Sequence, residues 1–293
     1  MSYWREREQR HIQQHILNDA QVERRLQQIQ RQAMREIQQQ INTFLARYAE
    51  KEGTSIAEVR KRISRLDMDI YSEKARRYVR EKNFTPQANQ EMRLYNLTMK
   101  TNRLELLKAH IWLDLVAAAN DMERYMLAEL KSDVLAEFER QSGMLGKTVE
   151  TLRTERNAAM VVNASFLSAT WSDRLWTNQD ALRLKLDGLL RRAITQGIHS
   201  SVLAREVRDE FGVSMKQATR LMRTEKARVQ TDVQRLSFEQ SGYAEYVFIA
   251  EHDSCDVCKA MDDQVYKVAS MQTGDNAPPM HPNCRCSTAA YMS

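Results

Sequence analysis

The sequence predicts a mostly α-helical protein: an elongated helical body followed by a small C-terminal unit that combines helix and strand. Six glycines and a single proline are spread over the first 240 residues, so few positions there would end a helix. Apolar residues recur every three or four positions through this part, as on one face of a helix. After Gly242 the pattern changes, because 246–250 and 265–268 are rich in β-branched and aromatic residues, which is typical of strands.

The first region, residues 1–142, is predicted to contain long helices. Its clearest apolar stripe consists of Val22, Leu26, Ile29, Ala33, Ile37, Ile41, Leu45 and Tyr48. Further helices are predicted from Ser55 and from the capping pair Thr85–Pro86. The glutamine-rich part of 9–40 could be read as low complexity, but the stripe running through it favours a helix that pairs with another helix or subunit. Association of the chain with itself or with a partner is therefore expected.

The central region, residues 143–242, begins at a glycine-containing linker and returns to helix. Residues 147–170 are rich in Thr, Ala, Asn and Ser, and we expect an exposed loop there. Helices are predicted from about 179 to Gly197, from Ser201 to a stop at Gly212, and from Ser214 to Gly242.

Composition limits the classes of function. The net charge of +5 and a pI of about 9.0 permit weak contact with phosphate groups without requiring it. No stretch approaches the roughly 18 apolar residues of a membrane span. The N-terminus lacks the apolar segment of a signal peptide, so we expect folding in the cytoplasm of the host cell, where thiols stay reduced.

All four cysteines lie at the C-terminal end, together with a histidine. Cys255 and Cys258 form a C-x2-C pair, and His281, Cys284 and Cys286 follow within six residues. Paired cysteines with a second Cys/His cluster are typical of zinc sites, and four of these five side chains would fill a tetrahedral shell. Cys255 and Cys258 are predicted ligands; the sequence leaves open which of the other three complete the site.

The C-terminal region, residues 243–293, is predicted to be a zinc-ribbon-like α+β unit. About 50 residues with two short strands bury little apolar surface, so a metal would hold the unit together. A full protein coordination shell leaves no open position, which indicates a structural role. The alternatives are reduced thiols buried in a core and disulfides formed after release from the cell.

Catalysis and specific DNA recognition are both disfavoured. The acids that flank the cysteines, Asp253, Asp256, Asp262 and Asp263, lie in polar turns where carboxylates are usually solvated. Neither a phosphate-binding glycine loop nor a nucleophile elbow occurs. The helix–glycine–helix pattern of 201–223 offers few base-reading side chains, so only non-specific contact between arginines and DNA is expected.

Three motifs resemble those of the phage Mu F-like head morphogenesis family, also called minor head or minor capsid proteins. They are the "CDVC" of 255–258, the "PPMHPNCRC" of 278–286 and the "RTE" of Arg223, Thr224 and Glu225. The resemblance covers about residues 170–293. One departure is Asp263, which stands where relatives often have glycine.

The resemblance implies a structural virion protein of a tailed phage rather than an enzyme. Such proteins bind the portal protein, enter the procapsid and are linked to head assembly and DNA delivery. Major capsid or scaffolding protein and genomic DNA are further expected contacts, and the expected location is the phage head near the portal. The alternatives are a nuclease or toxin-like effector carried in the virion and a DNA-binding zinc protein acting in packaging or ejection.

The triplet Arg223, Thr224 and Glu225 has two interpretations. It could form an interaction face for a partner. It could instead tie its helix to the C-terminal unit through ion pairs and a cap, since mixed charges on a helix are usually paired locally.

Overall fold

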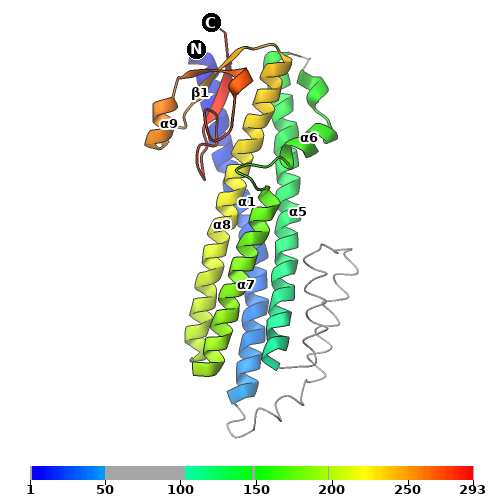
Figure 1. Cartoon of the computed structure of the whole chain (residues 1–293), viewed down its shortest axis with the longest axis vertical. Helices are drawn as coiled ribbons and strands as arrows, with labels where there is room; N and C mark the ends of the chain where they lie inside the picture. The colour runs from blue at the N-terminus through cyan, green and yellow to red at the C-terminus, as the bar shows by residue number, and fades with distance from the viewer. Residues whose placement is uncertain (1, 50–102, 147–148, 197, 293) are drawn as a thin grey trace. The chain divides into compact units, whose positions relative to one another are not determined.

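The computed structural model describes residues 2–49, 103–146, 149–196 and 198–292. Within these ranges the chain is mostly α-helical and has a small antiparallel sheet near its C-terminus, which confirms the predicted fold class (Figure 1). The predicted helices that begin at Ser55 and Thr85 lie outside the described residues.

The chain divides into two compact units. Unit 1 contains residues 1–26, 123–175 and 216–293, and unit 2 contains 27–122 and 176–215. Four long helices contribute residues to both: α1 (Ser2–Ala49), α5 (Arg103–Leu145), α7 (Trp171–Gln196) and α8 (Ser200–Gln240). The predicted division at 142 and 242 follows other criteria and stays a prediction.

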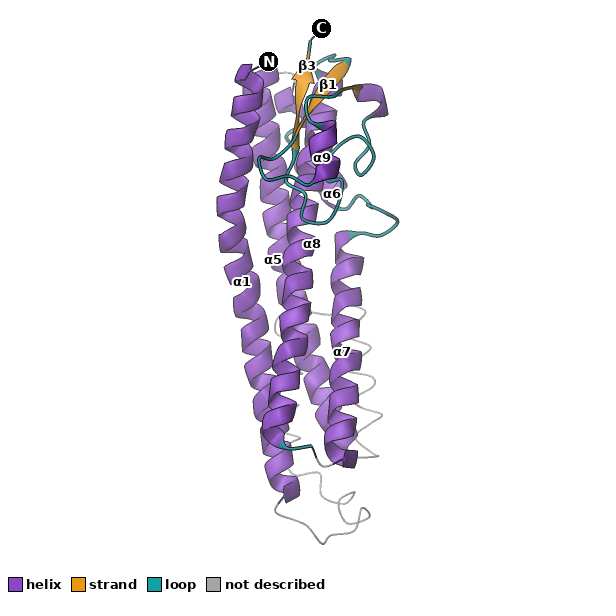
Figure 2. Cartoon of the chain, turned by 90° about the vertical axis from the view of Figure 1, so that its left-hand side faces the viewer, coloured by secondary structure: helices purple, strands orange, loops and turns teal. Residues whose placement is uncertain are grey.

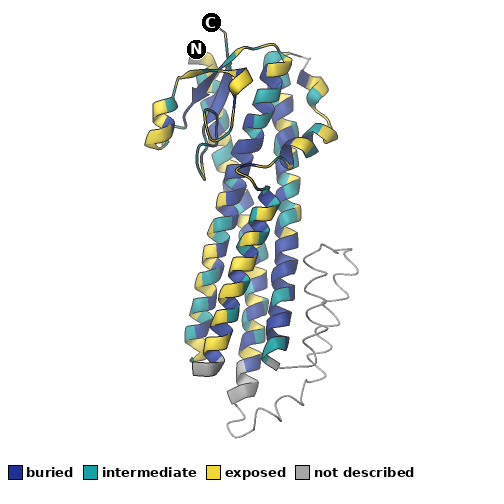
Figure 3. Cartoon of the chain, in the orientation of Figure 1, coloured by how far each residue is buried: buried dark blue, intermediate teal, exposed yellow. Residues whose placement is uncertain are grey.

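Unit 2 is a helical assembly around one apolar core. Parts of α1, α5 and α8 pack there with α7 (Trp171–Gln196), and their buried faces point toward one another (Figure 3). The core comprises Ala33, Ile37, Ile41, Phe44, Leu107, Ile111, Leu115, Ala118, Leu182, Leu186, Leu189, Leu190, Ala193, Leu203, Val207 and Phe211. Their three- and four-residue spacing on each helix is the amphipathic pattern that predicted these helices.

Unit 1 combines helices with a three-stranded sheet. The central strand β1 (Glu245–Ile249) pairs in antiparallel fashion with β2 (Val265–Lys267) and with β3 (Ser287–Tyr291). A short helix, α9 (Asp256–Met261), lies between β1 and β2 in the sequence and beside the strands in space (Figure 2). One sheet face carries Tyr246, which packs against Phe238 of α8. The sheet is thus held on the helical part of its own unit.

Two local predictions were wrong. Helix α8 continues through Gly212, whose exposed position between the buried Phe211 and Ser214 limits the cost of glycine to about 1 kcal/mol. The predicted loop 147–170 contains a 3₁₀ turn, Val149–Leu152, and helix α6, Glu155–Val162.

Helix α6 begins at a side-chain cap that the composition of the segment obscured. Thr154 Oγ1 accepts a hydrogen bond from the Asn157 N–H at 3.1 Å.

Strand β3 was not predicted at all, because Ser-Thr-Ala-Ala-Tyr lacks the usual enrichment in large β-branched residues. Among the described helices, none is both long and apolar enough to cross a membrane.

Candidate metal centre

Three segments of unit 1 carry the cysteine and histidine side chains. Cys255 is the N-cap residue of α9, and Cys258 lies in its first turn. The C-x2-C pair therefore sits at the start of a helix. His281, Cys284 and Cys286 come from the irregular segment before β3.

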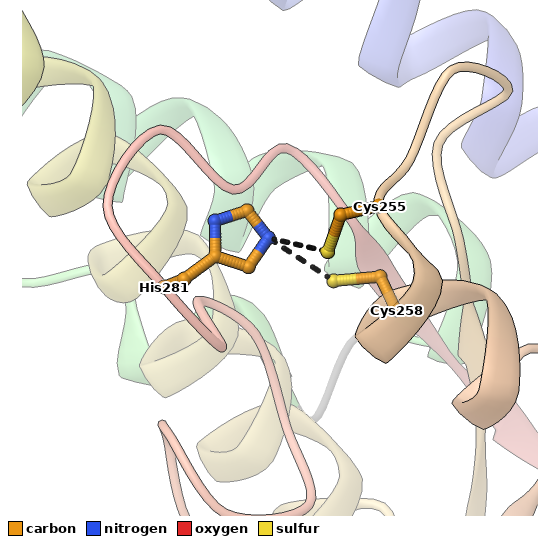
Figure 4. Close-up of side chains that lie close together, drawn as sticks. All are labelled: Cys255, Cys258 and His281. Carbon is orange, nitrogen blue, oxygen red and sulfur yellow. Dashed lines mark hydrogen bonds between the residues drawn. The ribbon is translucent and has the colours of Figure 1, made fainter.

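These segments bring all five side chains into one cluster. His281 Nε2 lies 3.2 Å from Cys255 Sγ and 3.4 Å from Cys258 Sγ (Figure 4). Cys258 Sγ lies 3.8 Å from Cys284 Sγ. The sulfurs of Cys258, Cys284 and Cys286 lie within 4.8 Å of one another. Cys258 is therefore common to both halves of the cluster.

The spacing and the donor types fit a tetrahedral metal ion. Zinc bonds of about 2.3 Å to sulfur and about 2.0 Å to nitrogen separate neighbouring ligand atoms by roughly 3.5–3.8 Å. The three short contacts, at 3.2–3.8 Å, are close to these expected separations between ligand atoms. His281 Nδ1 lies 2.9 Å from the Pro282 carbonyl oxygen, and a proton on Nδ1 leaves the Nε2 lone pair facing the sulfurs. These residues could hold a metal ion.

Negative charge gathers in the buried part of the cluster. Hydrogen bonds from the thiols of Cys258 and Cys286 lower the pKa of Cys284 to about 2. The same contact with Cys284 raises the pKa of Cys258. One thiolate among three buried sulfurs is an arrangement that a cation would stabilise, since a buried charge needs a partner.

The cluster borders a cavity of about 450 Å³. Its wall includes Gln13 and Ile16 of α1 in addition to residues of the cysteine-bearing segments. The start of the chain therefore forms part of the surroundings of the candidate site.

The triplet Arg223, Thr224 and Glu225 lies on α8 and makes contacts within unit 1. Thr224 Oγ1 accepts a hydrogen bond at 3.1 Å from the N–H of Asn283, next to Cys284. Arg223 Nε lies 3.6 Å from the Asp19 carboxylate, and Glu225 is buried and ion-paired to two arginines. These contacts support the intramolecular interpretation; a partner-binding role stays a prediction.

Sequence reasoning missed the part that the N-terminal helix plays here. Arg285, between two of the cysteines, donates to Asp19 at 2.8 Å, and the Ser287 hydroxyl donates to Glu8 at 2.7 Å. Glu8, Ile12, His15 and Asp19 extend the apolar stripe of α1 backwards at the same three- and four-residue spacing. The signal available in the sequence was the presence of polar residues at positions that continue the apolar stripe.

Comparison with known proteins supplies the deciding observation. Residues 185–289 match the family described as "Phage Mu protein F like protein". This part of the chain is a Mu F-like region. It contains all of α8, strands β1 and β2, the start of β3 and all five Cys/His side chains. No curated protein and no solved structure matched the chain.

The Mu F-like family is one of structural proteins of phage head morphogenesis. The match over this region suggests a likeness of the chain to phage head proteins.

Proposed function

We propose that the protein is a minor head protein of a tailed phage that binds the portal protein and takes part in procapsid assembly and in genome packaging or delivery. The observation that carries this proposal is the Mu F-like match, which spans the helix, sheet and cysteine cluster as one stretch of sequence. In this proposal the cluster acts as a structural element and performs no chemistry on a substrate.

Copurification tests the partner. The full chain is coexpressed with the portal protein of the same phage and isolated through an affinity tag on the portal. We expect the chain to be retained, and its absence from the eluate under conditions where both proteins are soluble would contradict the proposal. Arg223→Ala separates the two roles of the triplet: loss of retention without loss of thermal stability indicates an interaction face.

We also propose that the cluster holds one structural zinc ion. Cys255, Cys258, His281 and Cys284 are assigned as ligands because the short sulfur and nitrogen contacts link these four. Cys286 Sγ instead accepts a hydrogen bond from the Glu251 N–H at 3.4 Å. Zinc would join the start of α9 to the segment before β3 and so stabilise this part of unit 1.

Metal analysis of freshly reduced full-length protein tests this assignment. We expect one zinc per chain, retained in Cys286→Ser and lost or strongly weakened in Cys258→Ser. A stoichiometry well under one in the unaltered protein refutes the metal site, and zinc loss in Cys286→Ser refutes the ligand set alone. Adding a chelator should lower the melting temperature of the wild type.

A further inference from the structure

A second group of possible metal ligands lies on α1, outside both the cysteine cluster and the Mu F-like region. His11 and His15 are one helical turn apart, and their Nε2 atoms lie 3.0 Å from each other. The ring planes are inclined at 78°, with centroids 4.4 Å apart. Only one proton fits between two such nitrogens, so at least one Nε2 directs a lone pair at the other.

The environment keeps His15 neutral. Burial, followed by the charges of His11 and Lys226, lowers the pKa of His15 to about 3.

A buried carboxylate lies next to the pair. Glu137 Oε2 is 3.3 Å from His11 Nε2, and Glu137 is almost completely buried. The charged side chains of this network comprise three carboxylates and two cations. They are Glu8, Asp133, Glu137, Arg140 and Lys226. Glu137 attracts a cation at the pair, whereas the charges of Arg140 and Lys226 oppose it.

We propose that His11 and His15 form a second divalent-cation site, with the two Nε2 atoms as ligands and Glu137 as neighbouring negative charge. Metal–nitrogen bonds of about 2.0–2.1 Å that meet at a right angle place the nitrogens roughly 2.8–3.0 Å apart, whereas a tetrahedral angle needs roughly 3.3–3.4 Å. The 3.0 Å separation matches the right angle. Cations with octahedral or tetragonal preference, such as Ni²⁺ and Cu²⁺, suit this geometry, with water at the other positions.

The site differs in ligand chemistry from the cysteine cluster and does not depend on it. One helix supplies both ligands, so the bound ion would bridge two residues one turn apart and stabilise that turn of α1.

Nickel binding to the tag-free, zinc-loaded full chain tests the proposal. After equilibrium dialysis, elemental analysis should show one Ni²⁺ per chain with the zinc content unchanged. His11→Gln and His15→Gln should each weaken Ni²⁺ binding by about tenfold or more, as expected when one of two protein ligands is lost. His199→Gln, which alters an exposed histidine, should leave binding unchanged. No bound Ni²⁺ in the wild type, or equal binding in all variants, overturns the proposal.

A measurement on unaltered protein keeps the test decisive if the variants fail to fold. Substoichiometric Ni²⁺ should broaden the imidazole NMR signals of His11 and His15 before those of His199 and His252. Broadening that begins at His199 or His252, or displacement of zinc without broadening at the pair, means that the two histidines are only a hydrogen-bonded pair.

Discussion

The interiors of the two units differ in how much charge they bury. The core of unit 2 is apolar and rich in leucine, although the buried Lys108 pairs with Asp187 and Glu105 in that unit. The interior of unit 1 contains ion pairs, among them Glu8–Arg140–Glu137 and Glu225–Arg228, whose members are buried or nearly so. An apolar core gains stability from the area and volume that it fills, whereas a buried ion pair depends on every partner being present. We therefore expect unit 2 to respond to changes in volume, and unit 1 to the loss of single charges and to pH.

The largest effect is expected from removing a buried cation in unit 1. Arg140 Nη1 and Nη2 lie 2.5 Å from Glu8 and 2.7 Å from Glu137. Arg140→Met leaves two buried carboxylates without their partner and should cost about 3–5 kcal/mol of unfolding free energy, measured by urea denaturation. Arg235→Met removes the exposed partner of Glu239 and should cost less than about 1 kcal/mol. Equal costs would remove the contrast between buried and exposed pairs.

A cavity in unit 2 should cost about 2–5 kcal/mol. Leu186 is buried in its core, and Leu186→Ala loses packing that the surrounding helices cannot fully restore. Leu184, on the same helix, is 72% exposed, so Leu184→Ala should stay within about 0.5 kcal/mol of the wild type. Similar losses from both variants in urea denaturation would mean that the apolar core does not carry the stability of unit 2.

Lowering the pH should reduce the unfolding free energy of unit 1 by an amount on the order of 1 kcal/mol, because Glu137 becomes protonated. Burial alone would raise the pKa of this carboxyl, but the Arg140 charge and hydrogen bonds from His11 and Arg140 hold it below the ordinary value of 4.5. A depressed folded-state pKa contributes stability above the unfolded value, and this contribution is lost as pH falls from about 4.5 toward the lower folded pKa.

Glu137→Gln tests this dependence, because it removes the titrating group. The variant should have a shallower decline in unfolding free energy below about pH 4.5 than the wild type. Leu186→Ala should instead lower the curve at every pH without changing its slope. An unchanged slope in Glu137→Gln would mean that other carboxyls dominate the acid response.

The smallest effect is expected at the partly exposed rim of unit 1. Arg5 forms ion pairs with Asp262 and Asp263, and its side chain is 30% exposed. A double-mutant cycle of Arg5→Ala and Asp263→Asn should give a coupling of about 0.2–1 kcal/mol. That coupling should decrease at high salt, because exposed charges are screened. A coupling of several kcal/mol would place this pair with the buried network.

Local patterns predicted much of the fold and the membership of the cysteine cluster. Periodicity predicted the helices that bury Ile37, Leu186 and Val207, because an apolar stripe is a property of neighbouring residues. The strand Ser287–Tyr291 was not predictable in this way, since it gains its place by pairing with β1, about 40 residues earlier.

Long-range contacts of the candidate site were also beyond sequence reasoning. Asp19 meets Arg285, and Glu8 meets Ser287, across more than 260 residues of chain. Neither residue type nor spacing identifies a partner at that separation. The assignment of four ligands among the five Cys/His side chains likewise depends on distances, and it stays a prediction until metal is measured.

The joining of residues 1–26 with residues 216–293 in unit 1 has a consequence for the order of folding during synthesis. Unit 2 ends at residue 215, so all of its residues have been translated before most of unit 1's last segment exists. The contacts of Glu8 with Ser287 and of Asp19 with Arg285 cannot form until the C-terminal segment has left the ribosome. We infer that unit 2 folds first and that the start of α1 is incorporated last, when the C-terminal segment arrives.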